Sequence, residues 1–97
     1  MYKHLVLWKT KADASEEDVQ AMWNGLEELR AVPGVKNWSY GSNFHPKIKD
    51  YDGALSADFD TEEDLNAYKD HPLHVRVAEE KLFPLWEEFT VADYEFC

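Results

Sequence analysis

The apolar run near the start of the chain constrains the fold most, because it predicts a strand over residues 3–9 that needs cover on both faces. The side chains of a strand alternate between its two faces. Those of this run divide into His4, Val6 and Trp8 on one face and Leu5 and Leu7 on the other. A sheet with helices on one face and a second sheet against the other would cover both sets.

A regular amphipathic stripe predicts a helix after this strand. Ser15 suits its first cap and the Pro33–Gly34 pair suits its end, because serine caps helix starts while proline and glycine stop helices. The apolar side chains recur every three or four residues, as the buried face of a helix requires. They are Val19, Met22, Trp23, Leu26 and Leu29.

Period-two patterns and capping signals divide the rest of the chain into three strands and two helices. The strands are expected over residues 35–44, 51–59 and 89–96, and a polar loop over residues 45–50. Gly41 marks a bulge in the first of these strands. Thr61 caps one helix, and Pro72 interrupts it and begins the next, which runs to about Phe83. This order predicts a ferredoxin-like α+β fold, with a four-stranded antiparallel sheet and helices on one face.

The size and composition fit one domain over residues 1–97 that associates with a copy of itself. The chain has 97 residues, 44% of them hydrophobic, with four Trp, five Tyr and five Phe. Such a small domain buries its large side chains most readily in a symmetric homodimer. The net charge of −10 argues against nucleic acid and membrane as partners, since both need a basic surface.

The cysteine content and the N-terminus set the expected compartment. Cys97 is the only cysteine, so the chain forms no internal disulfide and no cysteine-based metal site. The first apolar run is too short for a signal peptide or a spanning helix. The expected location is therefore the cytoplasm.

Histidine is the main candidate for chemistry, because the chain lacks phosphate-loop, dinucleotide, serine-hydrolase and zinc-protease motifs. Its ordinary pKa, about 6.5, suits proton exchange near neutral pH. The histidines are His4, His45, His71 and His74. We interpret His45 as a loop residue and His71 as a helix-entry residue. The His71 and His74 pair lacks a third ligand, so we predict no metal site.

Two sets of residues can be interpreted either as functional groups or as structural ones. His4 lies on an apolar strand face, where it is either a strand-end residue that reaches water or a carbonyl, or a functional group. Tyr68 and His74 flank the bend at Pro72, which can bring their side chains to hydrogen-bond distance where one continuous helix could not. The pair is either a positioned base or a buried tyrosine satisfied by a histidine.

Four segments of the chain together carry a recognisable pattern. They are Lys3-His4-Leu5-Val6-Leu7, Phe59-Asp60-Thr61, His71-Pro72-x-His74 and the closing Asp93-Tyr94. This pattern resembles the stress-responsive dimeric α+β barrel (Dabb) family over essentially the whole chain. The resemblance implies a homodimer in which two ferredoxin-like sheets face each other as a barrel, with the helices outside.

The resemblance also implies a site. In olivetolic acid cyclase, a family member that closes a ring by aldol condensation without a cofactor, the base pair matches Tyr68 and His74, and a strand histidine matches His4. This chain departs from that relative at Leu26, where the relative has a tyrosine, and at Gly53, where it has a histidine. We therefore expect catalytic roles for His74, Tyr68 and His4. The rest of the expected pocket comprises Val6, Trp8, Met22, Trp23, Leu26 and Leu55, with His71 as a further binding residue.

Three functions follow as alternatives. The first is a cofactor-free cyclase or isomerase, in which His74, oriented by Tyr68, takes a proton next to a carbonyl of a small hydrophobic or aromatic ligand. His4 would bind the substrate oxygen. The second is a non-catalytic dimer that binds a small ligand or serves in stress response. The third is a cofactor-free monooxygenase, as related dimeric ferredoxin-like folds include such enzymes.

Overall fold

The computed structural model of the chain describes residues 1–45 and 51–97. Within these residues the elements follow the expected order. They are β1 (Tyr2–Thr10), α1 (Glu16–Glu28), β2 (Lys36–Ser42), β3 (Gly53–Phe59), α2 (Glu62–Asp70), α3 (Pro72–Val77) and β4 (Trp86–Glu95). A 3₁₀ turn at Leu29–Ala31 follows α1, and a π-helical segment, η2 (Ala78–Leu82), continues α3. The predicted polar loop lies, apart from His45, outside the described residues.

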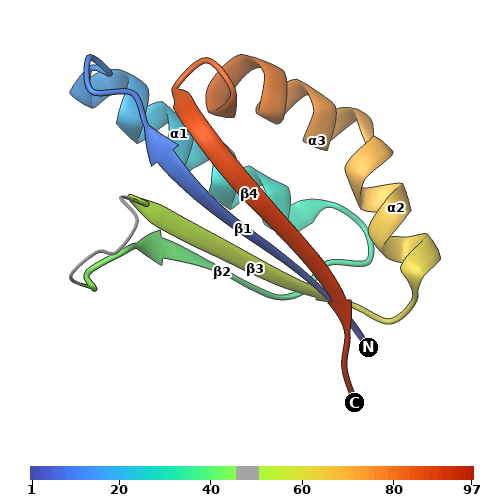
Figure 1. Ribbon diagram of the computed structural model, residues 1–97. Coiled ribbons are helices and arrows are strands. Elements are labelled where there is room, and N and C mark those ends of the chain that lie inside the picture. Colours follow the sequence, from blue (N-terminus) through green and yellow to red (C-terminus); the bar gives the residue numbers. More distant parts are fainter. Residues whose placement is uncertain (46–50) are drawn as a thin grey trace.

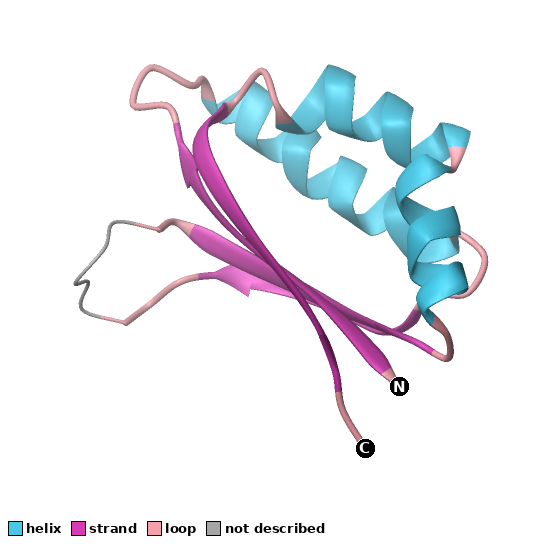
Figure 2. Ribbon diagram, turned by 45° about the vertical axis from the view of Figure 1, so that its right-hand side comes forward, coloured by secondary structure: helices cyan, strands magenta, loops and turns pink. Residues whose placement is uncertain are grey.

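The four strands form one antiparallel sheet in the order β2-β3-β1-β4. The helices all cover the same face of this sheet, and α3 runs above the edge strand β4 (Figures 1 and 2). The predicted ferredoxin-like α+β fold is therefore confirmed. The alternation predicted for β1 is confirmed as well, since His4, Val6 and Trp8 are buried under the helices.

The helix boundaries follow from their capping residues. The backbone N–H of Asp18 donates to the Ser15 hydroxyl, and that of Asp64 donates to the Thr61 hydroxyl. Each cap satisfies one of the N–H groups that a helix start leaves without a partner. The break between α2 and α3 is at His71, whose extended backbone reflects the restriction that Pro72 imposes on the residue before it.

The structure corrects two details of the strands. The irregular pairing in β2 lies between Lys36 and Ser39 rather than at Gly41, because Asn37 adopts a left-handed backbone with φ of 51°. An asparagine tolerates this conformation better than most residues. The last strand begins at Trp86, three residues earlier than residue 89, where alternation was expected to start.

Trp8 lies at the centre of the core, between the sheet and α1. Its ring is fully buried, stacks on Trp86 at 5.1 Å between ring centroids, and meets Trp23 edge-on at 5.8 Å. Gly53 is its partner on β3, directly opposite it in the pairing. A β-carbon at Gly53 would lie 2.7 Å from Cε2 of Trp8, far closer than a van der Waals contact. The indole therefore occupies the space that a side chain at position 53 would need.

On the other face of the sheet, no helix of residues 1–45 and 51–97 is present (Figure 2). Small and apolar side chains gather at its centre, where Leu5 pairs with Ser56 and Ala92. Leu7, next along this face, pairs with Ala54. Both leucines are partly exposed.

Candidate functional site

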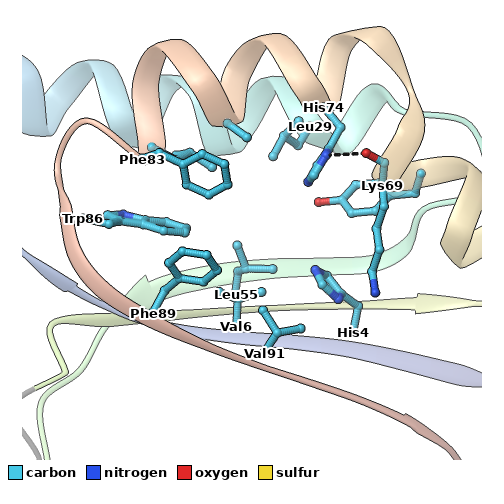
Figure 3. A pocket seen from close by; sticks show the side chains of 13 residues that line it. His4, Val6, Leu29, Leu55, Lys69, His74, Phe83, Trp86, Phe89 and Val91 are labelled. Carbon is cyan, nitrogen blue, oxygen red and sulfur yellow. Dashed lines mark hydrogen bonds between the residues drawn. The ribbon is translucent and has the colours of Figure 1, made fainter.

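A pocket of about 360 Å³ lies between the sheet and the helical segment from α3 to η2. Its volume is at the lower end of the range for small-molecule sites, roughly 300–1,000 Å³. Val6, Leu55 and Val91 line it on the sheet side, and Leu29 lines it on the helix side (Figure 3). His4, Lys69 and His74 mark a polar end, whereas Phe83, Trp86 and Phe89 mark an aromatic end (Figure 3).

His74 is oriented by the main chain of α2. Its Nδ1–H donates to the carbonyl oxygen of Lys69 at 3.0 Å, a bond that the bend at Pro72 allows (Figure 3). A carbonyl only accepts, so this contact places the proton of the neutral ring on Nδ1. The other ring nitrogen, Nε2, keeps a lone pair on the pocket side.

His4 is held in the same way by a carboxylate. Its Nδ1 lies 2.6 Å from Oδ1 of Asp93, and the other oxygen of Asp93 pairs with the Lys69 ammonium. Burial acts to raise the pKa of Asp93, but the hydrogen bonds from Lys69 and His4 outweigh it and hold that pKa below its ordinary value. Asp93 is therefore a carboxylate, and the neutral His4 also presents its Nε2 as an acceptor.

Tyr68 lies between the two histidines. Its ring centroid is 5.6 Å from that of His4 and 4.6 Å from that of His74. The structure gives its hydroxyl no hydrogen bond to any described residue. Burial raises the pKa of Tyr68 well above its ordinary value, so the phenol stays protonated and is a donor at neutral pH.

The pKa values of both histidines lie below the ordinary value. Burial is the main cause in each, because it disfavours the charged imidazolium. Asp93 opposes this shift at His4, and the Lys69 carbonyl opposes it at His74. The rings are therefore mainly neutral at pH 7. Two basic nitrogens and one phenol donor converge at this end of an apolar pocket, a set that can exchange protons with a bound molecule.

The structure separates the expected site residues into two groups. His4, Val6, Leu55, Tyr68 and His74 line the pocket. The others lie elsewhere: Trp8, Met22 and Leu26 in the core, Trp23 half-buried against Tyr40, and His71 at the start of α3. His71 accepts the backbone N–H of Leu73 at 3.1 Å and so serves as a helix cap.

The contact that orients His74 also differs from the expected one. Tyr68 contacts His74 only through their rings, whose planes are tilted by 53°, while the Nδ1–H of His74 donates to the main-chain carbonyl of Lys69. A backbone carbonyl leaves no mark in the sequence, so this partner could not be predicted.

Three contributors to the site were not predicted from the sequence: the aromatic end of the pocket, Lys69, and Asp93, which holds His4. Asp93 shares the inner face of its strand with Phe89 and Val91, and this alternation was the available signal. The aromatic end could not be predicted, because Phe83 and Trp86 flank a turn and no repeating pattern links them. Lys69 gave no signal, because its role depends on where the helix lies.

Residues 1–45 and 51–97 hold neither a metal-ligand cluster nor a helix suited to a membrane. No three His, Cys, Asp or Glu side chains there gather as metal ligands would. None of the helices in that part of the chain has the length and apolar character to span a bilayer.

The fold and the pocket define a ferredoxin-like α+β domain with a pocket between its sheet and its helices. The chain belongs to the Dabb family, since the model of the stress responsive A/B barrel domain matches residues 2–96. Two curated proteins of Arabidopsis thaliana, both stress-response A/B barrel domain-containing proteins, are similar to it. One is 32% identical over 95% of this chain and 35% of that protein. The other is 36% identical over 80% of this chain and 39% of that protein. The chain thus spans little more than a third of these relatives.

Solved structures repeat the fold closely. A Dabb protein from Mesorhizobium loti has a TM-score of 0.84 at 29% identity, over 99% of this chain and 96% of that one. A dimeric ferredoxin-like protein from Thermobifida fusca has a TM-score of 0.85 at 25% identity, over 98% and 90%. A hydroxynitrile lyase from Passiflora edulis shares the fold, with a TM-score of 0.86 at 21% identity, over 96% and 90%. A candidate antibiotic biosynthesis monooxygenase from Nitrosomonas europaea also shares it, with a TM-score of 0.76 at 18% identity, over 99% and 98%.

Proposed function

We propose that this Dabb domain binds a small carbonyl compound and catalyses proton transfer next to its carbonyl group without a cofactor. One observation carries the proposal. His4 and His74 each donate Nδ1–H to a fixed acceptor, which leaves two basic Nε2 atoms beside a protonated Tyr68 in one apolar pocket. A low pKa keeps each base unprotonated at neutral pH, and the apolar walls strengthen every polar contact.

The proposed reaction begins at His74. Its Nε2 takes a proton from the carbon next to the carbonyl, and the electron pair of that C–H bond moves into the enolate. The Tyr68 hydroxyl donates a hydrogen bond to the enolate oxygen, where negative charge develops. The enolate carbon then attacks a second carbonyl, whose oxygen takes the proton back from His74 as the ring closes. Where a double bond is conjugated with the enolate, the proton instead returns from His74 to the far carbon of that system, which shifts the double bond and isomerises the compound.

His4 is proposed to bind an oxygen of the substrate. In its neutral form Nε2 accepts a hydrogen bond from a hydroxyl group. In its protonated form, which the Asp93 carboxylate favours, the same nitrogen donates to a carbonyl or enolate oxygen. A hydroxynitrile lyase is among the proteins that share this fold, so the fold can host a lyase.

The test is the exchange of α-protons for deuterium in small ketones, followed by NMR in heavy water. We expect His74→Ala to lower the exchange rate by about 100-fold or more, and Tyr68→Phe to lower it less. His45→Ala is the matched control, because His45 is exposed and does not line the pocket. Equal rates in wild type, His74→Ala and Tyr68→Phe would refute the proposal. No exchange in any protein, with only stability affected by His74→Ala, would favour the non-catalytic alternative.

We also propose that the domain works as a homodimer joined through the open face of its sheet. Leu5 and Leu7 are apolar on this face, and their strand partners Ala54, Ser56 and Ala92 have small side chains. The neighbours from Thermobifida fusca and Bacteroides fragilis are described as dimeric. Two such sheets, facing each other, would form the barrel with the helices outside.

A further inference from the structure

We propose that the pocket selects compact carbonyl compounds that carry an aromatic ring over aliphatic compounds of the same size. This inference rests on the proposed function, since the carbonyl group would lie at the histidine end. It is based on the end of the pocket opposite the histidines, where three aromatic side chains meet (Figure 3).

Phe83, Trp86 and Phe89 form this end as one connected set of rings. Phe83 and Phe89 stack at 5.3 Å between centroids with 16° between their planes. Trp86 meets Phe89 at 5.5 Å and Phe83 at 6.3 Å, with tilted and edge-on geometry. These spacings are those of aromatic pairs that gain energy from the charge distribution of their rings. A fourth ring, supplied by a ligand, could join the set on the pocket side.

Trp86 is the most firmly held of the three rings. One face of its indole stacks on the fully buried Trp8, at 5.1 Å with 9° between the planes. Its Nε1–H donates to the sulfur of Met22 at 3.2 Å. Trp8 is itself fixed against Gly53, which leaves no room for it to retreat. Trp86 is therefore a firmly held ring at the aromatic end, whereas Phe83 and Phe89 are each 46% exposed and flank it.

A set of aromatic rings at one end of the pocket favours a flat ligand with an aromatic surface. A flat ring meets it face to edge with little loss of conformational freedom, whereas a flexible chain would lose freedom in several bonds. The volume of about 360 Å³ also restricts the ligand to a compact molecule. A cyclohexyl group has a larger apolar surface than a phenyl group, so hydrophobic burial alone would favour the cyclohexyl compound. The two mechanisms predict opposite orders of affinity.

The experiment compares benzylacetone with its cyclohexyl analogue, which carry the same methyl ketone. Binding is followed through the indole N–H resonance of Trp86 in a heteronuclear NMR titration, assigned with Trp86→Phe. We expect benzylacetone to bind about threefold or more tightly than the analogue. Equal affinities, tighter binding of the analogue, or no shift of the Trp86 signal with benzylacetone would overturn the inference.

Variants of the pocket residues then test which rings cause the preference for benzylacetone. Phe89→Leu keeps an apolar side chain and removes a ring, so it should abolish the preference for benzylacetone, and Phe83→Leu should reduce it. Phe44→Leu is the matched control, since Phe44 is 98% exposed and does not line this pocket. A preference that survives both pocket variants would refute the role of the aromatic end. The titration needs no turnover, so a ring preference without α-proton exchange would refute the proposed function while leaving this inference standing.

Discussion

His4 and Asp93 face each other directly across β1 and β4, and the Nδ1–H of His4 donates to the Asp93 carboxylate at 2.6 Å. Lys69 of α2 pairs with the other oxygen of the same carboxylate. Asp93 thus joins the two strands to the helix at the polar end of the pocket. The hydrogen bond to Asp93 fixes the tautomer of His4. In many functional histidines, too, the hydrogen bond at one ring nitrogen sets the role of the other.

Replacement of Asp93 by Asn should lower the pKa of His4 further. The carboxylate favours the imidazolium through its hydrogen bond and its charge, and both effects weaken when the charge is removed. An NMR titration of the His4 ring protons in Asp93→Asn would measure the shift. Asp13→Asn, at an exposed position, is the control. An unchanged or raised pKa of His4 in Asp93→Asn would contradict the role of this pair.

Acidification below the ordinary histidine pKa, about 6.5, should destabilise the domain. The folded pKa values of His4 and His74 are lowered, so the unfolded chain binds more protons than the folded one in this window. The free energy of unfolding therefore falls as the pH drops from about 7 toward the lowered values. Urea denaturation at several pH values would show a shallower fall in His74→Gln. His45→Gln should follow the wild-type profile, and a wild-type stability that rises on acidification would contradict the pKa directions.

Substitution of Gly53 by Ala should cost about 1–3 kcal/mol of the free energy of unfolding, because the new β-carbon would overlap the Trp8 indole. Gly41→Ala is the matched control on the neighbouring strand, where a β-carbon meets no described atom within 4 Å. Urea denaturation of both variants measures the difference. Equal stabilities would show that Trp8 can move aside, which would also weaken the description of Trp86 as firmly held.

A charge on the open face of the sheet should break the proposed homodimer. Leu5→Glu places one carboxylate from each protomer in the two-fold interface, where both would be buried without partners. Sedimentation equilibrium should then show a shift from dimer to monomer. Val75→Glu, on the exposed side of α3, is the control and should leave the assembly unchanged. A wild-type chain that is monomeric at all concentrations would refute the homodimer.

Local patterns in the sequence predicted most of the fold. The alternation in β1, the helix caps at Ser15 and Thr61 and the break at Pro72 all depend on residues near each other in the chain. The bulge at Asn37 escaped prediction, since glycine is the usual signal for such a backbone and asparagine a weaker one. The early start of β4 was missed because its first residues, Trp86 to Glu88, combine one buried ring with two exposed charges.

The candidate site, like the fold, was predicted in part from local patterns and depends in part on contacts between distant elements. Local periodicity predicted the ferredoxin-like fold and the inward faces of His4 and Tyr68, because the period of each element sets which side chains face the core. The hydrogen-bond partners of the histidines and the shape of the pocket follow from how the elements pack in three dimensions. The hydrogen bonds to His4 and His74 come from strand pairing and from the path of the main chain, and the aromatic end arises where a helix and a strand meet. Such contacts depend on distances between elements, which no local pattern encodes.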